Sequence, residues 1–154
     1  RKEFDFILID CPAGIEQGFK TAIAAADTAI VVTMPEISAV RDADKIIGEL
    51  SRADKEDIKL IVNRIRPQMV ESGDMLDMND INDILSIDCI GQVPDDEMVV
   101  TSTNKGEPCI TMEHSLAGQA YRNIVGRICG EDIPFMEFPK EGFFQRLKRR
   151  VFGA

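Results

Sequence analysis

Short apolar runs alternate along this chain with longer stretches that have helical periodicity. Continuously apolar runs rich in β-branched residues are typical of strands buried on both faces of a parallel sheet. Strands that alternate with helices predict a doubly wound α/β sheet with right-handed crossovers. The predicted strands cover residues 4–9, 28–33, 58–63 and 88–93.

The intervening stretches predict the helices. In the stretch 38–52 the apolar residues fall on one helical face, and Ser38 is a residue type that favours a helix N-cap. The sequence shows no internal repeat and no low-complexity segment. The predicted helices cover residues 16–26, 38–52, 77–85, 97–102 and 115–129.

Charge is distributed unevenly over the 154 residues. The formal net charge is −9, but residues 140–154 carry +4, which leaves −13 on the rest of the chain. A body this acidic argues against a nucleic-acid partner. The four cysteines form no CxxC pair and His114 is the only histidine, so no zinc or iron–sulfur site is expected within one chain.

The basic C-terminal stretch is also rich in phenylalanine. When residues 143–152 are placed on a helix, Phe143, Phe144, Leu147 and Val151 form an apolar stripe roughly 100° wide. An apolar stripe with basic flanks predicts an amphipathic helix that lies in a membrane interface. The alternatives are a helix that docks on its own domain and a disordered basic tail. No apolar run approaches the ~20 residues that span a bilayer.

Three regions follow from these patterns. Residues 1–130 are predicted to form the α/β domain, residues 131–139 a linker containing two prolines, and residues 140–154 the membrane-targeting helix. The residues predicted to contact the membrane are Phe143, Phe144, Arg146, Leu147, Lys148, Arg149, Arg150, Val151 and Phe152.

The first predicted strand ends in an aspartate. An apolar strand that ends in Asp10 matches the Walker B arrangement, in which the carboxylate supports a Mg²⁺ ion bound to nucleotide phosphates, usually through water. Gly14 would let a backbone N–H approach the γ-phosphate. The alternative is an aspartate that only caps the turn.

Six segments in order resemble the MinD/ParA family of deviant Walker A ATPases. They are DFILIDCPAGIEQ (5–17), PEISAVRDAD (35–44), VNRIRP (62–67), SGDMLDMNDI (72–81), GQVPDDE (91–97) and NKGEP (104–108). Together with the basic tail they cover essentially the whole chain. The resemblance implies the mostly parallel sheet of P-loop NTPases, with ATP and Mg²⁺ as cofactors.

The resemblance also implies roles for residues at the strand ends. Asp10 and Gly14 would be the catalytic residues, with Asp10 supporting Mg²⁺ through water. Asn63 and Arg64 would contact the adenine base, and Pro94 and Asp95 would add further base contacts. For Asn63 the residues alone leave open a second interpretation, a cap on the loop after the strand.

The resemblance is strongest to the members that help place the division septum. It implies an ATP-dependent homodimer that recruits a MinC-like division inhibitor, is positioned by a MinE-like or other factor, and cycles between the cytoplasm and an anionic inner membrane surface. Arg41, Asp42 and Asp44 would bind the protein partners. From the residues alone, the default interpretation of this helix face is a solvated, charge-laced surface.

The phosphate-binding loop of the family is not in this sequence. No GxxxxGK[ST] pattern occurs in residues 1–154, and residue 1 is an arginine. We therefore expect a fragment, truncated at the N-terminus, that does not hydrolyse ATP alone. The alternatives are a flagellar-number regulator of the same family, a DNA-partitioning ATPase of the ParA type, and a non-enzymatic module that binds partners at a membrane.

Overall fold

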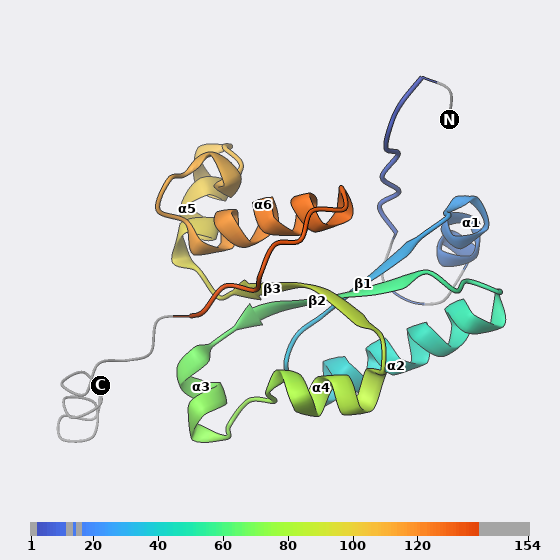
Figure 1. Cartoon of the computed structure of the whole chain (residues 1–154), viewed down its shortest axis with the longest axis horizontal. Coiled ribbons are helices and arrows are strands. Elements are labelled where there is room, and N and C mark those ends of the chain that lie inside the picture. The colour runs from blue at the N-terminus through green and yellow to red at the C-terminus, as the bar shows by residue number, and fades with distance from the viewer. Residues whose placement is uncertain (1–2, 12–13, 15–16, 139–154) are drawn as a thin grey trace.

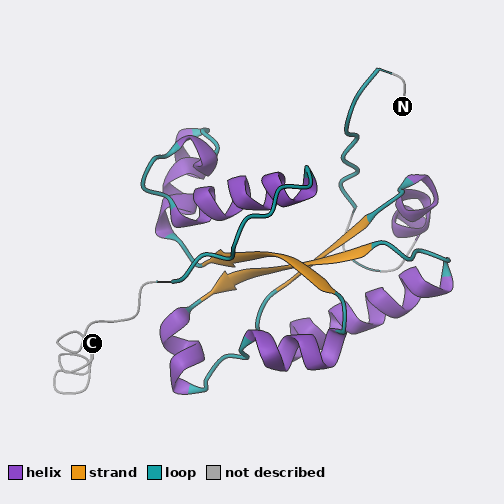
Figure 2. Cartoon of the chain, in the orientation of Figure 1, coloured by secondary structure: helices purple, strands orange, loops and turns teal. Residues whose placement is uncertain are grey.

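A three-stranded parallel sheet forms the centre of the molecule (Figure 2). The computed structural model describes residues 3–11, 14 and 17–138. Strand β1 (Ala29–Thr33) pairs with β2 (Ile58–Ile65), which pairs with β3 (Asp88–Pro94). These strands confirm three of the four predicted from the sequence, and their parallel order confirms the α/β fold class.

Helices cover both faces of this sheet (Figure 1). On one face lie α2 (Ile37–Arg52) and α4 (Met78–Leu85), and on the other lie α5 (Glu97–Lys105) and α6 (Leu116–Ile128). Helix α1 (Gln17–Ala25) precedes β1, and α3 (Pro67–Ser72) follows β2. A 3₁₀ turn (Cys109–Thr111) joins α5 to α6.

Strand β2 separates two hydrophobic cores. Leu60 and Val62 are fully buried in the core under α2 and α4, whereas Ile61 packs in the core under α6. Neighbouring residues point to opposite faces because the side-chain period of a strand is two. The unbroken apolar run IKLIV is therefore explained by a strand that is covered on both faces.

Local capping signals define some of the helix ends. The carboxylate of Asp77 accepts hydrogen bonds from the amides of Asn79 and Asp80, and Ser115 Oγ accepts one from Gly118 N. The prediction that Ser38 caps α2 is wrong, because the helix begins one residue before Ser38 and its N-cap is Glu36.

Helix α3 was not predicted. It begins at a proline, whose missing N–H costs nothing in a first turn, and it ends at Ser72, followed by Gly73 as C-cap with φ +77°.

The predicted strand 4–9 is wrong for this structure. The segment is described but forms no strand, and its side chains are exposed, with Leu8 88 % and Phe4 67 % accessible. A strand needs a hydrogen-bonded neighbour and a covering face. Among the described residues, the edge of β1 opposite β2 has no paired strand, and the segment runs away from the sheet (Figure 1).

The segment predicted as a linker lies against the domain in its described part. Arg127 of α6 donates hydrogen bonds to the carbonyl oxygens of Ile90, Ile133 and Pro134, and its guanidinium lies 4.3 Å from the ring centroid of Phe135. Further on, Met136 packs against the core under α6, and Phe138 against the core under α2 and α4. We call residues 131–138 the strap.

The membrane-targeting helix predicted for residues 140–154 lies outside the described residues. The same holds for every residue predicted to contact a membrane. Within the part of the chain that the structure does describe, none of the helices has the length and apolar character required to cross a bilayer.

Candidate functional site

The carboxyl end of β2 is distorted at the two residues predicted to contact a base. The register between β2 and β3 shifts between Val62 and Ile65, and Arg64 has φ +59°. A non-glycine residue in this region costs about 1–3 kcal/mol and is frequent at binding sites. The side-chain oxygen of Asn63 accepts a 2.9 Å hydrogen bond from Arg64 N. Asn63 therefore does cap the loop. This bond uses the side-chain oxygen of Asn63 and does not involve its NH₂ group.

Two arginines converge on Asp95 just beyond this distortion. Arg64 Nε lies 3.6 Å from Asp95 Oδ1, and Arg66 Nε lies 2.6 Å from Asp95 Oδ2. The backbone N–H of Asp95 also donates to the carbonyl of Ile65, at 2.9 Å. These contacts bring the loops after β2 and β3 together. All three side chains keep exposed area, about 59 % for Arg64, 51 % for Arg66 and 31 % for Asp95.

Arg66 is a site residue that the sequence analysis missed. It was quoted in the VNRIRP segment without a role, because its partner is 29 residues away along the chain. The available signal was a second arginine two positions after Arg64, near the end of a strand.

Asp96, which follows Asp95 in the chain, supports the loop after β3. Its carboxylate accepts hydrogen bonds from Met98 N at the start of α5, and from Ser115 Oγ and Ala117 N at the start of α6. Partial burial raises the pKa of Asp96, but hydrogen bonds from backbone amides and the Ser115 hydroxyl outweigh it. The pKa therefore lies below its ordinary value of 3.8. One carboxylate holds two helix starts and the end of β3 in a fixed arrangement.

This arrangement has the chemistry to hold a nucleotide base. Guanidinium planes stack on aromatic rings, and the Asn63 amide and Asp95 carboxylate can exchange hydrogen bonds with ring nitrogens and an exocyclic amine. Pro94 is buried at the end of β3, where it fixes the backbone beside Asp95. Ligands of doubly wound sheets bind at this carboxyl edge.

The structure does not join Asp10 and Gly14 to this site. Asp10 is exposed and makes no hydrogen bond or ion pair with the residues that the structure describes. Gly14 has φ +99°, which only glycine adopts without strain. The Asp10 carboxylate is the ligand type that Mg²⁺ prefers, and Mg²⁺ sites often use one carboxylate together with nucleotide phosphates. No group of three potential metal ligands occurs among the described residues.

The predicted partner-binding residues are all exposed on α2. Arg41, Asp42 and Asp44 are spread around the part of the helix that the buried Val40 and Ala43 do not occupy. Asp42 forms a 2.8 Å ion pair with Lys45 in which both side chains are more than 70 % exposed. Exposed pairs contribute little to stability, so this face is available for another role.

Comparison with known proteins adds the following. No family model matches the sequence. The septum site-determining protein MinD of Synechocystis is 49 % identical over 157 aligned residues, which cover 100 % of this chain and 59 % of that protein. The chain therefore spans about three fifths of this relative.

Two solved structures resemble the fold. The MinC:MinD cell division protein complex of Aquifex aeolicus matches with a TM-score of 0.85 and 45 % identity, covering 90 % of this chain and 57 % of that one. MinD of Pyrococcus horikoshii complexed with Mg-ADP matches with a TM-score of 0.71 and 28 % identity, covering 82 % of this chain and 51 % of that one.

Proposed function

We propose that this chain, which septum site-determining MinD proteins match over its full length, belongs to the MinD/ParA family and forms part of a membrane-cycling ATPase that helps place the division septum. It supplies the base-recognition half of the nucleotide site and the membrane anchor. The glycine-rich phosphate loop of the family does not occur in residues 1–154, so we expect these residues alone not to hydrolyse ATP.

One observation carries the nucleotide part of this proposal. Asn63, Arg64, Arg66 and Asp95 meet at the carboxyl edge of the sheet, on a distorted strand end that costs free energy to maintain. A relative with the same fold is complexed with Mg-ADP. In the proposed site Pro94 and Asp95 contact the base beside Asn63 and Arg64, and Asp10 supports Mg²⁺.

The membrane part follows from charge and avidity. A single short amphipathic helix is marginal in water and binds a membrane weakly and reversibly. Two tails in one ATP-dependent homodimer act together, which adds ~10²–10⁴ in avidity. ATP binding thus places the protein on the inner face of the membrane, and hydrolysis returns it to the cytoplasm.

Protein partners are assigned to the exposed face of α2. Arg41→Glu and Asp44→Lys should each weaken binding of a MinC-type inhibitor by roughly tenfold, or about 1.4 kcal/mol, and weaken a MinE-type factor similarly. Folding should be unaffected because both side chains are exposed. Calorimetric titration measures the affinities. The matched control is Lys20→Glu, a charge reversal on the exposed face of α1. Unchanged affinity for both partners would remove this assignment.

The membrane mechanism is tested by vesicle co-sedimentation with the protein extended to the full length of its relatives. We expect pelleting with anionic vesicles in ATP and much less in ADP or with neutral vesicles. Phe144→Glu should lower the apparent affinity at least about tenfold, because burying one phenylalanine ring is worth ~1.5–3 kcal/mol.

The matched control is Gln145→Glu, which adds the same charge on the back of the predicted helix. It should retain most of the binding, since it leaves the apolar stripe intact. Pelleting that is indifferent to nucleotide would keep the anchor and remove the ATP control. A complete lack of pelleting under all of these conditions would refute the membrane part.

A further inference from the structure

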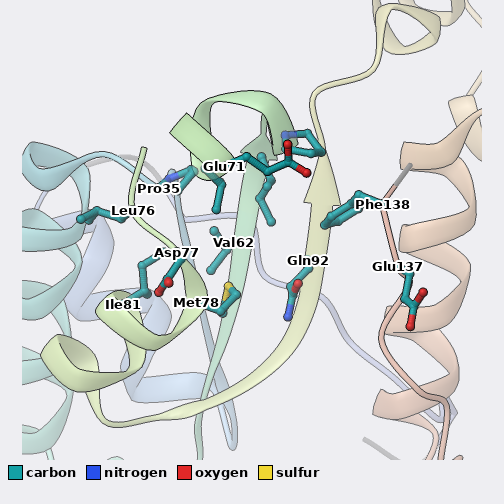
Figure 3. A pocket seen from close by; sticks show the side chains of 13 residues that line it. Pro35, Val62, Glu71, Leu76, Asp77, Met78, Ile81, Gln92, Glu137 and Phe138 are labelled. Atoms are coloured by element: carbon teal, nitrogen blue, oxygen red, sulfur yellow. The ribbon is translucent and has the colours of Figure 1, made fainter. Parts of the chain in front are cut away.

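A pocket opens on the face of the sheet that α2 and α4 cover, beside α3 (Figure 3). Its volume is about 730 Å³, within the ~300–1,000 Å³ of pockets that enclose drug-sized ligands. Its wall is largely apolar and is contributed by β2, α3, the start of α4 and the strap. Its apolar lining residues include Ile65, Val70, Met78 and Phe138.

The charged residues of this pocket are all acidic. Glu71, Asp77 and Glu137 line it, and Asp77 and Glu137 lie on opposite sides in Figure 3. Residues 67–104 contain nine Asp or Glu and no Lys, Arg or His, whereas Arg64 and Arg66, which flank the lining residue Ile65, are paired with Asp95. An apolar cavity with an acidic rim favours an occupant that is apolar in the middle and basic at its edges.

The strap ends in the pocket wall, and a segment of this kind, the C-terminal stretch that begins at Phe143, follows it in the chain. Phe138, the last described residue, is itself part of the pocket wall. Arg127 fixes the strap upstream of that point through three backbone carbonyls and the Phe135 ring. Phe143 follows five residues later and so lies within roughly 17 Å of Phe138 along the chain.

We propose that this pocket binds the chain's own C-terminal segment, residues 143–151, whenever that segment is not on a membrane. Side chains of the apolar stripe, led by Phe144 and Leu147, enter the pocket. The flanking Arg and Lys side chains face Glu71 and Glu137 on its rim. Docking covers an apolar stripe that would otherwise face water, and the same stripe cannot enter a bilayer while it is docked.

This inference rests on the proposed membrane function and adds a competitor to it. If the docked form makes up about nine molecules in ten, the apparent affinity for vesicles is about tenfold weaker than that of a free tail. Docking of the tail in the pocket therefore raises the avidity that a dimer needs in order to stay on the membrane. A weaker pocket should produce a protein that binds vesicles too readily.

The test uses Leu147→Trp in the 154-residue chain, which contains no other tryptophan. In buffer without vesicles we expect a blue-shifted emission maximum that is independent of protein concentration. Adding Met78→Glu in the pocket wall, or Glu137→Lys on the strap, should return the emission to that of an exposed indole. Both should also tighten binding to anionic vesicles by up to about tenfold.

Val100→Glu is the matched control, because Val100 is 64 % exposed on α5 and does not line the pocket. It should change neither the emission nor the vesicle affinity. Glu137→Lys is the second pocket variant in case Met78→Glu fails to fold, because Glu137 is exposed and its replacement should leave the fold intact. Circular dichroism checks the fold of both variants.

Three results would overturn docking: an exposed indole in the unmodified pocket, a blue shift that survives both pocket variants, or a blue shift that disappears on dilution and so indicates a second copy. Failure of the membrane function gives a different result. In that case the vesicles have no effect on any variant, while the blue shift in buffer and its loss in the pocket variants persist.

Discussion

Replacing Gly118 by alanine should destabilise the domain by about 3 kcal/mol. Gly118 is buried in the first turn of α6, where the helix crosses the 3₁₀ turn at Cys109. A Cβ at this position would collide with the carbonyl oxygen of Cys109 and lie 3.2 Å from Ile110 Cα. These are backbone atoms, so a side-chain rotation cannot relieve the overlap and α6 must move away from the turn.

Gly48 provides the matched control for this substitution. It lies inside α2, and a Cβ there would meet nothing within 4 Å. Gly48→Ala should therefore stabilise the domain by roughly 0.5–1 kcal/mol through helix propensity alone. Urea unfolding followed by circular dichroism measures both changes. Equal effects of the two substitutions would show that α6 does not press on the 3₁₀ turn as described.

Asp96→Ala should have the second large effect, a loss of about 2–4 kcal/mol. The substitution removes the acceptor of Met98 N at the start of α5 and of Ala117 N at the start of α6. It also leaves the hydroxyl of Ser115, which is 1 % exposed, without its acceptor. Asp83→Ala on the exposed face of α4 is the matched control and should cost less than about 0.5 kcal/mol.

The cost of Asp96→Ala should depend on pH. Because the folded-state pKa of Asp96 lies below its ordinary value of 3.8, the carboxylate stabilises the fold fully above that value. The contribution is lost as pH falls through the lowered pKa. Unfolding free energies at pH 7 and below pH 3.8 should therefore show the difference between the two proteins shrinking in acid. A difference that stays constant would mean that the charge of Asp96 does not contribute.

Some residues of the candidate site could be identified from the sequence, and others only from the structure. Asn63, Arg64, Pro94 and Asp95 were found because they follow apolar strands and match family segments. The positive φ of Arg64 and the register shift beside it leave no such mark in the sequence. Arg66 and Asp96 were missed because their partners lie 29 and about 20 residues away.

The dependence on distant partners also explains which of the predicted strands formed. The runs at 28–33, 58–63 and 88–93 became β1, β2 and β3 because each finds a neighbouring strand and a covering helix within the described chain. The run at 4–9 has the same apolar character and formed no strand, because pairing is a property of two segments.

The sequence by itself determined the alternation of strands and helices, the caps at Asp77 and Ser115, and the charge contrast between body and tail. Each of these depends on side chains a few positions apart. Only the tertiary structure decided that Arg127 ties the strap to β3, that two arginines meet at Asp95, and that Phe138 closes an acidic-rimmed pocket. Those contacts join segments that are brought together by burial of the two cores, and no local pattern encodes which segments will meet.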